Sequence, residues 1–192
     1  QGEETVIYPG TCRDKEYALV NSSVDVAWRF RVNPGQTTFK DVLAGTQIEN
    51  VSKEVGDFVI KRKDGLWAYH LAVVVDDIRQ GVTEVVRGRD LLSSTARQLQ
   101  LYEALGAQAP LYVHIPLWLD DTGHRLSKRR GDDIQTIGRL RRAGVSPEKI
   151  LGVVGQALDL CAPGESLAAI NLADRLENHV LQRHSVTQNS VF

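Results

Sequence analysis

Residues 82–119 decide the fold: Val82-Thr-Glu-Val-Val86 begins this stretch, and Leu111-Tyr-Val-His-Ile-Pro-Leu-Trp-Leu119 ends it. Both runs are short and apolar, which is typical of buried strands. Between them, Ser94 or Thr95 can cap a helix that continues to Leu105 and stops at Gly106. The strand–helix–strand order predicts a parallel crossover unit of an α/β protein. Ligands of such sheets bind beyond the carboxyl ends of the strands, where Arg87 follows the first run.

A cationic segment, His124-Arg-Leu-Ser-Lys-Arg-Arg-Gly131, follows the second run after the turn-forming Asp120-Asp-Thr-Gly123. Lys128 can act as a mobile point charge, Ser127 as a hydroxyl donor, and Gly131 lets the backbone bend. Charge alone favours a solvated basic loop. The position of the loop after a buried strand is also suited to a polyphosphate, on the same rim of the sheet as Arg87.

The part of the chain before residue 66 has strand-like patterns. Val24 to Val32 alternates, with Val24, Val26, Trp28, Phe30 and Val32 on one half-buried face. A second extended region spans Thr37 to Val51 with a turn at Gly45, and Phe58 to Arg62 is a third strand. Together they predict an antiparallel insertion, separate from the parallel unit. Leu66 to Asp77 is apolar on both sides and ends in Asp76-Asp77. Periodicity does not separate a helix from a strand here, and we favour a buried helix.

The last third of the chain is expected to be helical. Ile134 to Ala143 is basic and amphipathic, Ser146-Pro147 begins a helix that continues to about Cys161, and Ser166 to about His184 is a last helix before a frayed polar tail. The first of these helices carries Arg139, Arg141 and Arg142, which suit contacts with phosphates.

Composition narrows the class of protein. The 192 residues are 42% hydrophobic and 24% charged, with a formal net charge of −1 and two cysteines. No apolar run approaches the roughly 20 residues of a membrane-spanning helix, so we expect no membrane partner. Two cysteines indicate no disulfide framework, which favours the reducing cytoplasm. The net charge near zero excludes a protein that coats nucleic acid indiscriminately. The basic residues between His124 and Arg142 instead suit contact with one defined phosphate surface.

Several motifs together resemble glutamyl-tRNA synthetases, which are class I aminoacyl-tRNA synthetases. The likeness covers roughly residues 8 to 160. Arg-Leu-Ser-Lys-Arg resembles the signature loop of that class in the form typical of the glutamate enzymes. The matching segments, in order, are Gly65 to Asp77, Val85-Val-Arg-Gly-Arg-Asp-Leu-Leu-Ser-Ser-Thr95, Leu101-Tyr-Glu-Ala-Leu-Gly106, His114-Ile-Pro-Leu117 and Arg125 to Arg129.

The resemblance implies a role for particular residues. Tyr69 and Arg87 would hold the substrate glutamate, and a bidentate pair between Arg87 and a carboxylate is chemically reasonable. Lys128 would be the catalytic lysine that contacts the phosphates of ATP, which binds with Mg²⁺. Tyr8 and Cys12 would supply half of a zinc site whose Cys-x-Cys half lies upstream. The resemblance also implies ATP contacts from Arg125, Ser127 and Leu117, and tRNA contacts from Arg139, Arg141 and Arg142.

Within this family the chain resembles the truncated glutamyl-queuosine tRNA(Asp) synthetases, because Arg87-Gly-Arg-Asp departs from the Arg-Gly-Glu-Asp of full-length enzymes. We expect residues 1–131 to be the second half of the Rossmann-type catalytic domain, with an antiparallel insertion, and residues 132–192 to be a helical region that contacts the tRNA stem. The chain lacks methionine, and the first half of the nucleotide-binding fold is expected upstream. The expected protein is a monomer. The alternatives are part of a conventional glutamyl-tRNA synthetase and a non-catalytic tRNA-binding module.

Overall fold

The computed structural model describes residues 7–14, 26–119, 136–177 and 185–187. The chain divides into two compact units, residues 1–114 and 115–192, and each is described by itself. The predicted functional division after residue 131 stays a prediction. No helix in the described ranges is long and apolar enough to cross a membrane.

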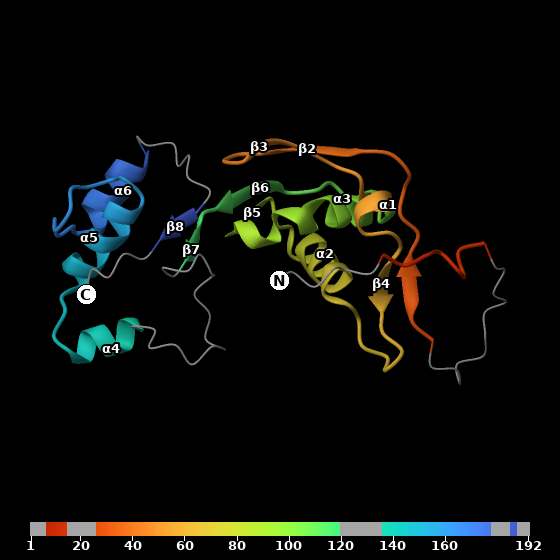
Figure 1. Ribbon diagram of the computed structural model, residues 1–192, viewed down its shortest axis with the longest axis horizontal. Coiled ribbons are helices and arrows are strands. Elements are labelled where there is room, and N and C mark those ends of the chain that lie inside the picture. Colours follow the sequence, from red (N-terminus) through yellow and green to blue (C-terminus); the bar gives the residue numbers. More distant parts are fainter. Residues whose placement is uncertain (1–6, 15–25, 120–135, 178–184, 188–192) are drawn as a thin grey trace. The chain divides into compact units, whose positions relative to one another are not determined.

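The first unit is built on a mixed four-stranded sheet in the order β3-β2-β6-β5 (Figure 1). The strands β2 (Thr37–Asp41) and β3 (Gly45–Glu49) form an antiparallel hairpin, and Gly45 accommodates a φ of 72° at the predicted turn. On its other side β2 pairs in parallel with β6 (Leu111–Ile115). The predicted antiparallel pairing is confirmed, and β2 in addition joins the same sheet as β6, which the sequence did not reveal.

The predicted strand–helix–strand crossover is confirmed. The strand β5 (Glu84–Gly88) leads through the 3₁₀ helix η1 (Arg89–Ser94) into α3 (Thr95–Ala104) and on to β6. The backbone N–H of Leu111, at the start of β6, donates to the carbonyl of Thr83, just before β5, so the two strands begin at the same edge. The helix α3 continues directly from η1, and the Ser94 side chain makes no capping hydrogen bond.

A two-stranded antiparallel ribbon of β1 (Trp28–Phe30) and β4 (Phe58–Lys61) lies beside this sheet. The prediction that Trp28 shares the half-buried face of Phe30 is wrong, because Trp28 is 51% exposed. The register of the pair shifts between Trp28 and Arg29, where β4 carries one extra residue, Ile60. The exposed ring of Trp28 lies beside the Lys61 ammonium.

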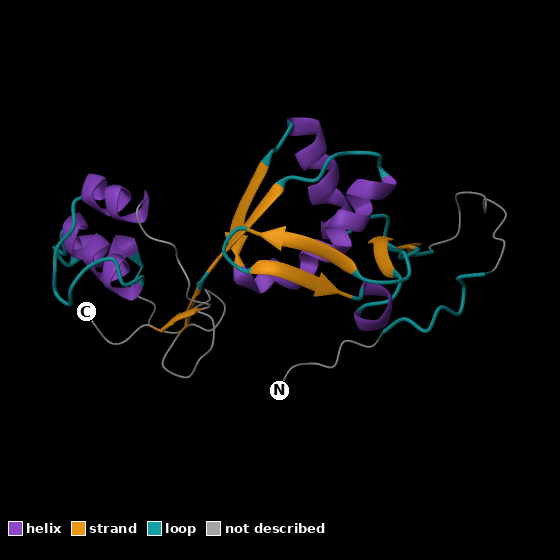
Figure 2. Cartoon of the chain, turned by 90° about the horizontal axis from the view of Figure 1, so that it is seen from above, coloured by secondary structure: helices purple, strands orange, loops and turns teal. Residues whose placement is uncertain are grey.

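Helices pack on one face of the four-stranded sheet, as Figure 2 shows. The helix α3 packs against β2 and against α2 (Tyr69–Gln80), and the short helix α1 (Val51–Glu54) follows β3. The predicted helix after Leu66 exists, but it is half-buried and continues through Asp76-Asp77 to a left-handed Gly81. The helix does not end at the acidic pair: Asp76 faces solvent, and Asp77 is half-buried and accepts a hydrogen bond from the Tyr102 hydroxyl at 3.3 Å. The core joins the helices to β4 and the segment after β1 through Val32, Val51, Phe58, Val74, Ala96, Leu101 and Tyr102.

Two predicted strands differ in detail from those observed. The run from Leu111 to Leu119 is divided at Pro116 into β6 and β7 (Leu117–Leu119), because proline has no N–H for the ladder. The strand β5 is only partly buried, and Val86 lies on its exposed side. Its apolar composition was therefore a poor guide to burial on both faces.

The second unit is mostly helical, as predicted. It contains α4 (Ile137–Arg142), α5 (Pro147–Ala157) and α6 (Ala169–Glu177). The predicted cap of α5 is confirmed, since the Ser146 hydroxyl accepts from the N–H of Lys149 at 3.3 Å. The last helix begins at Ala169 rather than Ser166. The predicted fraying is wrong for Ser185–Thr187, which form β8 and pair in parallel with β7, because an unpaired strand edge accepts any extended segment.

Candidate functional site

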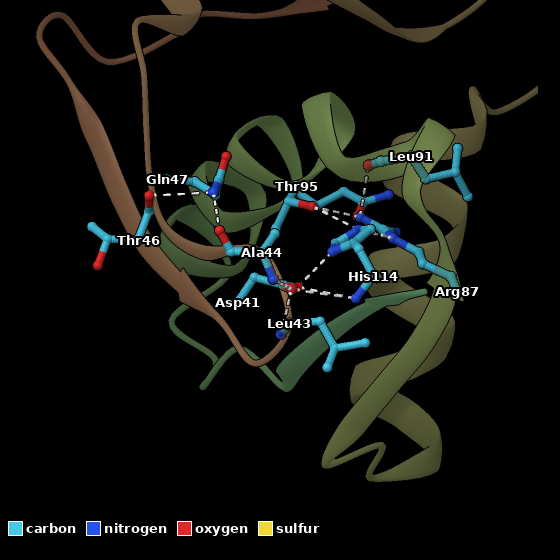
Figure 3. Close-up of polar contacts among 10 residues, drawn as sticks. Asp41, Leu43, Ala44, Thr46, Gln47, Arg87, Leu91, Thr95 and His114 are labelled. Carbon is cyan, nitrogen blue, oxygen red and sulfur yellow. Dashed lines mark hydrogen bonds and ion pairs between the residues drawn. The ribbon is translucent and has the colours of Figure 1, made fainter. Parts of the chain in front are cut away.

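Arg87 stands at the centre of the candidate site, near the carboxyl end of β5. Its guanidinium donates from Nε to His114 Nε2 at 2.9 Å and from Nη1 to Gln98 Oε1 at 2.8 Å. Its Nη2 donates to the Leu91 carbonyl at 3.2 Å and to Thr95 Oγ1 at 2.8 Å, as Figure 3 shows in part. Because arginine has five N–H groups, one N–H of Nη1 has no acceptor among the described residues.

This arrangement bears on how Arg87 could bind a carboxylate. A bidentate pair, as expected from the sequence, needs two unoccupied N–H groups on one edge of the guanidinium. Here the Arg87 guanidinium offers one. A carboxylate would therefore accept a single charge-assisted hydrogen bond from Arg87, unless an internal acceptor such as Gln98 moved away.

His114 connects Arg87 to a buried carboxylate. His114 and Asp41 are both 0% exposed, and His114 Nδ1 lies 2.6 Å from Asp41 Oδ2. An arginine N–H can only donate, so Nε2 of His114 must accept, and the ring proton must lie on Nδ1, facing Asp41. Burial is the main cause that lowers the pKa of His114, and the Arg87 charge acts in the same direction against the opposing effect of Asp41. His114 is therefore neutral at physiological pH.

Asp41 also holds the tip of the β2–β3 hairpin. Its Oδ1 accepts the backbone N–H groups of Leu43 at 3.0 Å and of Ala44 at 2.7 Å. Its Oδ2 accepts the backbone N–H of His114 at 3.2 Å as well as the ring proton. Burial raises the pKa of Asp41, but these hydrogen bonds together outweigh it and hold the pKa below its ordinary value. The Asp41 carboxylate is thus charged, and both of its oxygens accept hydrogen bonds.

Gln98 extends the contacts of Arg87 toward Tyr69. The amide nitrogen of Gln98 lies 3.5 Å from His70 Nδ1, and the rings of His70 and Tyr69 meet edge to face with centroids 5.4 Å apart. Burial, with the nearby charges of Arg97 and Arg87, lowers the pKa of His70 to about 4. Tyr69 itself is 55% exposed, so its hydroxyl is available at the surface of the unit.

Aromatic side chains line the other side of the guanidinium. Arg87 lies over the ring of Tyr112, with its central carbon 5.0 Å from the ring centroid. Burial raises the pKa of Tyr112 to about 12, and the neighbouring phenol of Tyr69 contributes in the same direction. Of the two residues expected to hold glutamate, Arg87 therefore contacts the ring of Tyr112, whereas Tyr69 contacts the ring of His70.

The predicted half zinc site has the expected local shape. Pro9 and the left-handed Gly10 form a turn that brings Cys12 back to Tyr8, whose phenol oxygen accepts the Cys12 backbone N–H at 2.9 Å. A structural zinc ion needs four ligands, and no group of three or more His, Cys, Asp or Glu side chains suited to a metal occurs in the described part of the chain. Tyr8 and Cys12 therefore fit two of the four ligand positions of such a site.

The remaining predicted residues belong to other parts of the chain. Arg125, Ser127 and Lys128 lie outside the described residues, so their placement is not tested. Leu117 begins β7 and is half-buried. Arg139, Arg141 and Arg142 are exposed on α4, while Leu140 is buried beneath them.

Sequence reasoning missed the residues that hold Arg87. None of Asp41, Thr95, Gln98 and His114 was predicted to contact Arg87, although Thr95 and His114 belong to the quoted motifs. A weak signal existed in two of them, because an acidic residue at the end of a strand and a histidine inside an apolar strand both need partners when buried. The sequence did not reveal that they are partners of each other, 73 positions apart.

Comparisons with known proteins agree on one family. The catalytic-domain model of class I tRNA synthetases (E and Q) matches residues 14–178. The Glutamyl-Q tRNA(Asp) synthetase of Cupriavidus metallidurans is 43% identical over 166 residues, which are 83% of this chain and 51% of that protein. The protein of the same name from Chromobacterium violaceum is 48% identical over 129 residues, 67% of this chain and 42% of that protein. The chain thus spans about half the length or less of the curated relatives it matches.

A solved structure supports the same fold. The crystal structure of a glutamate tRNA ligase from Elizabethkingia meningosepticum, in complex with its amino acid, superposes with a TM-score of 0.65 at 25% identity. The match covers 84% of this chain and 36% of that one.

Proposed function

The chain belongs to the catalytic-domain family of the class I tRNA synthetases for glutamate and glutamine, and from this membership we propose that it takes part in activating glutamate with ATP. The glutamate would then be transferred to the queuosine base in the anticodon of tRNA(Asp). The observation that carries the proposal is the Arg87 guanidinium, which hydrogen bonds fix near the carboxyl end of β5. The names of relatives 43% and 48% identical to the chain support the choice of tRNA.

In the activation step, a carboxylate oxygen of glutamate attacks the α-phosphorus of ATP. A new O–P bond forms, the bond to the β-phosphate oxygen breaks, and pyrophosphate leaves. Arg87 would hold a glutamate carboxylate by one charge-assisted hydrogen bond, and the Tyr69 hydroxyl would supply another donor. Lys128 would stabilise the charge that develops on the leaving pyrophosphate, which Mg²⁺ accompanies. ATP would also contact Arg125, Ser127 and Leu117.

In the transfer step, a hydroxyl of queuosine attacks the carbonyl carbon of glutamyl-adenylate, an ester forms, and AMP leaves. The tRNA would contact the basic face of α4. Arg139, Arg141 and Arg142 lie there within six residues and are exposed. Contacts of this kind with phosphates make affinity fall steeply with salt. We propose residues 132–192 as this stem-contact region. The enzyme would be monomeric and cytoplasmic. A zinc ion would be bound by Tyr8, Cys12 and two further ligands.

The acceptor RNA separates this proposal from its rivals. The complete natural protein is incubated with ATP, labelled glutamate and three RNAs: tRNA(Asp) containing queuosine, its unmodified transcript, and tRNA(Glu). We expect label only on the first, released by mild base as an ester. Label on the terminal adenosine of tRNA(Glu) would instead identify a conventional glutamyl-tRNA synthetase. Binding without labelling of any RNA would identify a non-catalytic tRNA-binding module.

A further inference from the structure

Asp41, His114 and Arg87 form a chain of buried hydrogen bonds with a fixed direction, here named the relay. Arg87 Nε donates to His114 Nε2, and His114 Nδ1 donates to Asp41 Oδ2. The opposite tautomer would place the Nε2 proton against the Arg87 N–H, so two donors would face each other at 2.9 Å. The carboxylate of Asp41 is therefore the group that selects the tautomer accepted by Arg87.

We propose that Asp41 and His114 are positioning residues for glutamate recognition, which act by fixing the Arg87 guanidinium so that one N–H of its Nη1 remains for the substrate. This inference rests on the proposed function, since it concerns the same carboxylate. The relay occupies Nε, while Thr95 and the Leu91 carbonyl occupy Nη2. Rotation of the guanidinium would break several of these bonds at once. Arg87 is thus oriented before glutamate arrives, which reduces the ordering required on binding.

Asp41→Asn tests the relay because asparagine has the same shape. Every partner of Asp41 is a donor: the Leu43 and Ala44 backbone N–H groups on Oδ1, and the His114 backbone N–H and ring on Oδ2. Only the imidazole can change from donor to acceptor. If the asparagine NH₂ faced the hairpin, it would meet two backbone N–H donors, those of Leu43 and Ala44. If it faces His114, it meets one, the His114 backbone N–H, because the ring can accept instead. The asparagine therefore turns its NH₂ toward His114. The His114 proton then moves to Nε2 and displaces Arg87.

The assay is glutamate-dependent ATP–pyrophosphate exchange by the complete natural protein. For Asp41→Asn we expect the KM for glutamate to rise by about tenfold or more, with the KM for ATP unchanged within about twofold. A matched control is Asp57→Asn. Asp57 is likewise buried, at 5% exposure, and accepts from the Val32 N–H at 3.0 Å and from Arg13 at 2.9 Å, away from Arg87. The control should lower stability without changing the KM for glutamate.

A second measurement reads the tautomer directly and needs no activity. In ¹⁵N NMR spectra of the wild-type protein, the His114 signal, assigned by its loss in His114→Gln, should show an Nδ1 proton. In Asp41→Asn it should show an Nε2 proton. A wild-type Nε2–H tautomer overturns the proposal even where Asp41→Asn does not fold. An unchanged tautomer in Asp41→Asn, or a changed tautomer with an unchanged KM, overturns it too. Absence of exchange in the wild-type protein would count against the proposed function and leave the NMR result to decide the relay.

Discussion

Replacing Arg87 by lysine keeps the charge but removes the fork of donors, and it should cost about 2 to 3 kcal/mol of folding stability. A lysine ammonium has three donors at one point and cannot reach His114, Gln98 and Thr95 in their observed places. The acceptor Nε2 of His114 is fully buried, and without Arg87 it would keep only the longer contact with the Thr95 hydroxyl, at 3.4 Å. An unsatisfied buried polar group costs about 1 to 3 kcal/mol, and each lost hydrogen bond to a charged group costs about 1.5 to 3. Arg87 itself is only half-buried, so water can replace part of this.

The free energy of unfolding would be measured by urea titration followed by circular dichroism, with the slope m compared between variants. A matched control is Arg89→Lys, the same chemical change two positions along the chain. Arg89 is half-buried in η1 and donates no hydrogen bond to any residue in the described ranges. Its replacement should change stability by less than about 0.5 kcal/mol. If the two variants lost the same free energy, the hydrogen bonds of Arg87 would not stabilise the fold and the reasoning above would be refuted.

Three further predictions concern other parts of the chain. Gly152→Ala should destabilise the second unit by about 2 kcal/mol or more in urea titration, since the added Cβ would lie 1.9 Å from the Glu165 carbonyl oxygen; Gly138→Ala, whose Cβ has only one neighbour at 4.0 Å, should be neutral or stabilising. The free energy of unfolding should decline by about 1 to 2 kcal/mol as pH falls from 6.5 to about 4. In this range His70 takes up a proton in the unfolded chain at its ordinary pKa, whereas burial lowers its pKa to about 4 in the folded protein. His70→Gln should flatten that decline in urea titrations at several pH values. Lys128→Ala should slow glutamate activation about a hundredfold in single-turnover assays while glutamate affinity is kept.

The sequence predicted the parallel crossover and most helices because each depends on a local signal. Apolar runs bounded by Gly106 and the cap at Ser146 lie within a few residues of the elements that they define. The errors have non-local causes. Trp28 is exposed in a sheet where, among the described strands, β1 pairs with β4 alone, and Ser185–Thr187 form a strand because β7 offers them an edge. Neither fact is present in the segment itself.

The candidate site was predicted unevenly for the same reason. A motif places Arg87 at the end of a strand, and that part could be predicted because strand order and residue type are local. The orientation of the Arg87 guanidinium could not be predicted, because it depends on Asp41. That residue lies in a hairpin that the sequence did not connect to the parallel unit. The parallel pairing of β2 with β6 brings Asp41 beside His114.

The Asp41 carboxylate binds the hairpin directly and acts on Arg87 through His114. These two roles explain why the residue at position 41 should be aspartate. Oδ1 fixes the hairpin turn through two backbone N–H groups, and Oδ2 fixes the tautomer of His114. An amide offers an acceptor on one side only, and a glutamate would place its carboxylate one methylene further from the four donors that Asp41 binds. A distortion of the β2–β3 turn would therefore be transmitted to Arg87 through a single side chain. Substitutions at the hairpin tip that leave Asp41 intact should change glutamate recognition only when they move Oδ1, which is the expected behaviour of a positioning residue and not of a direct ligand.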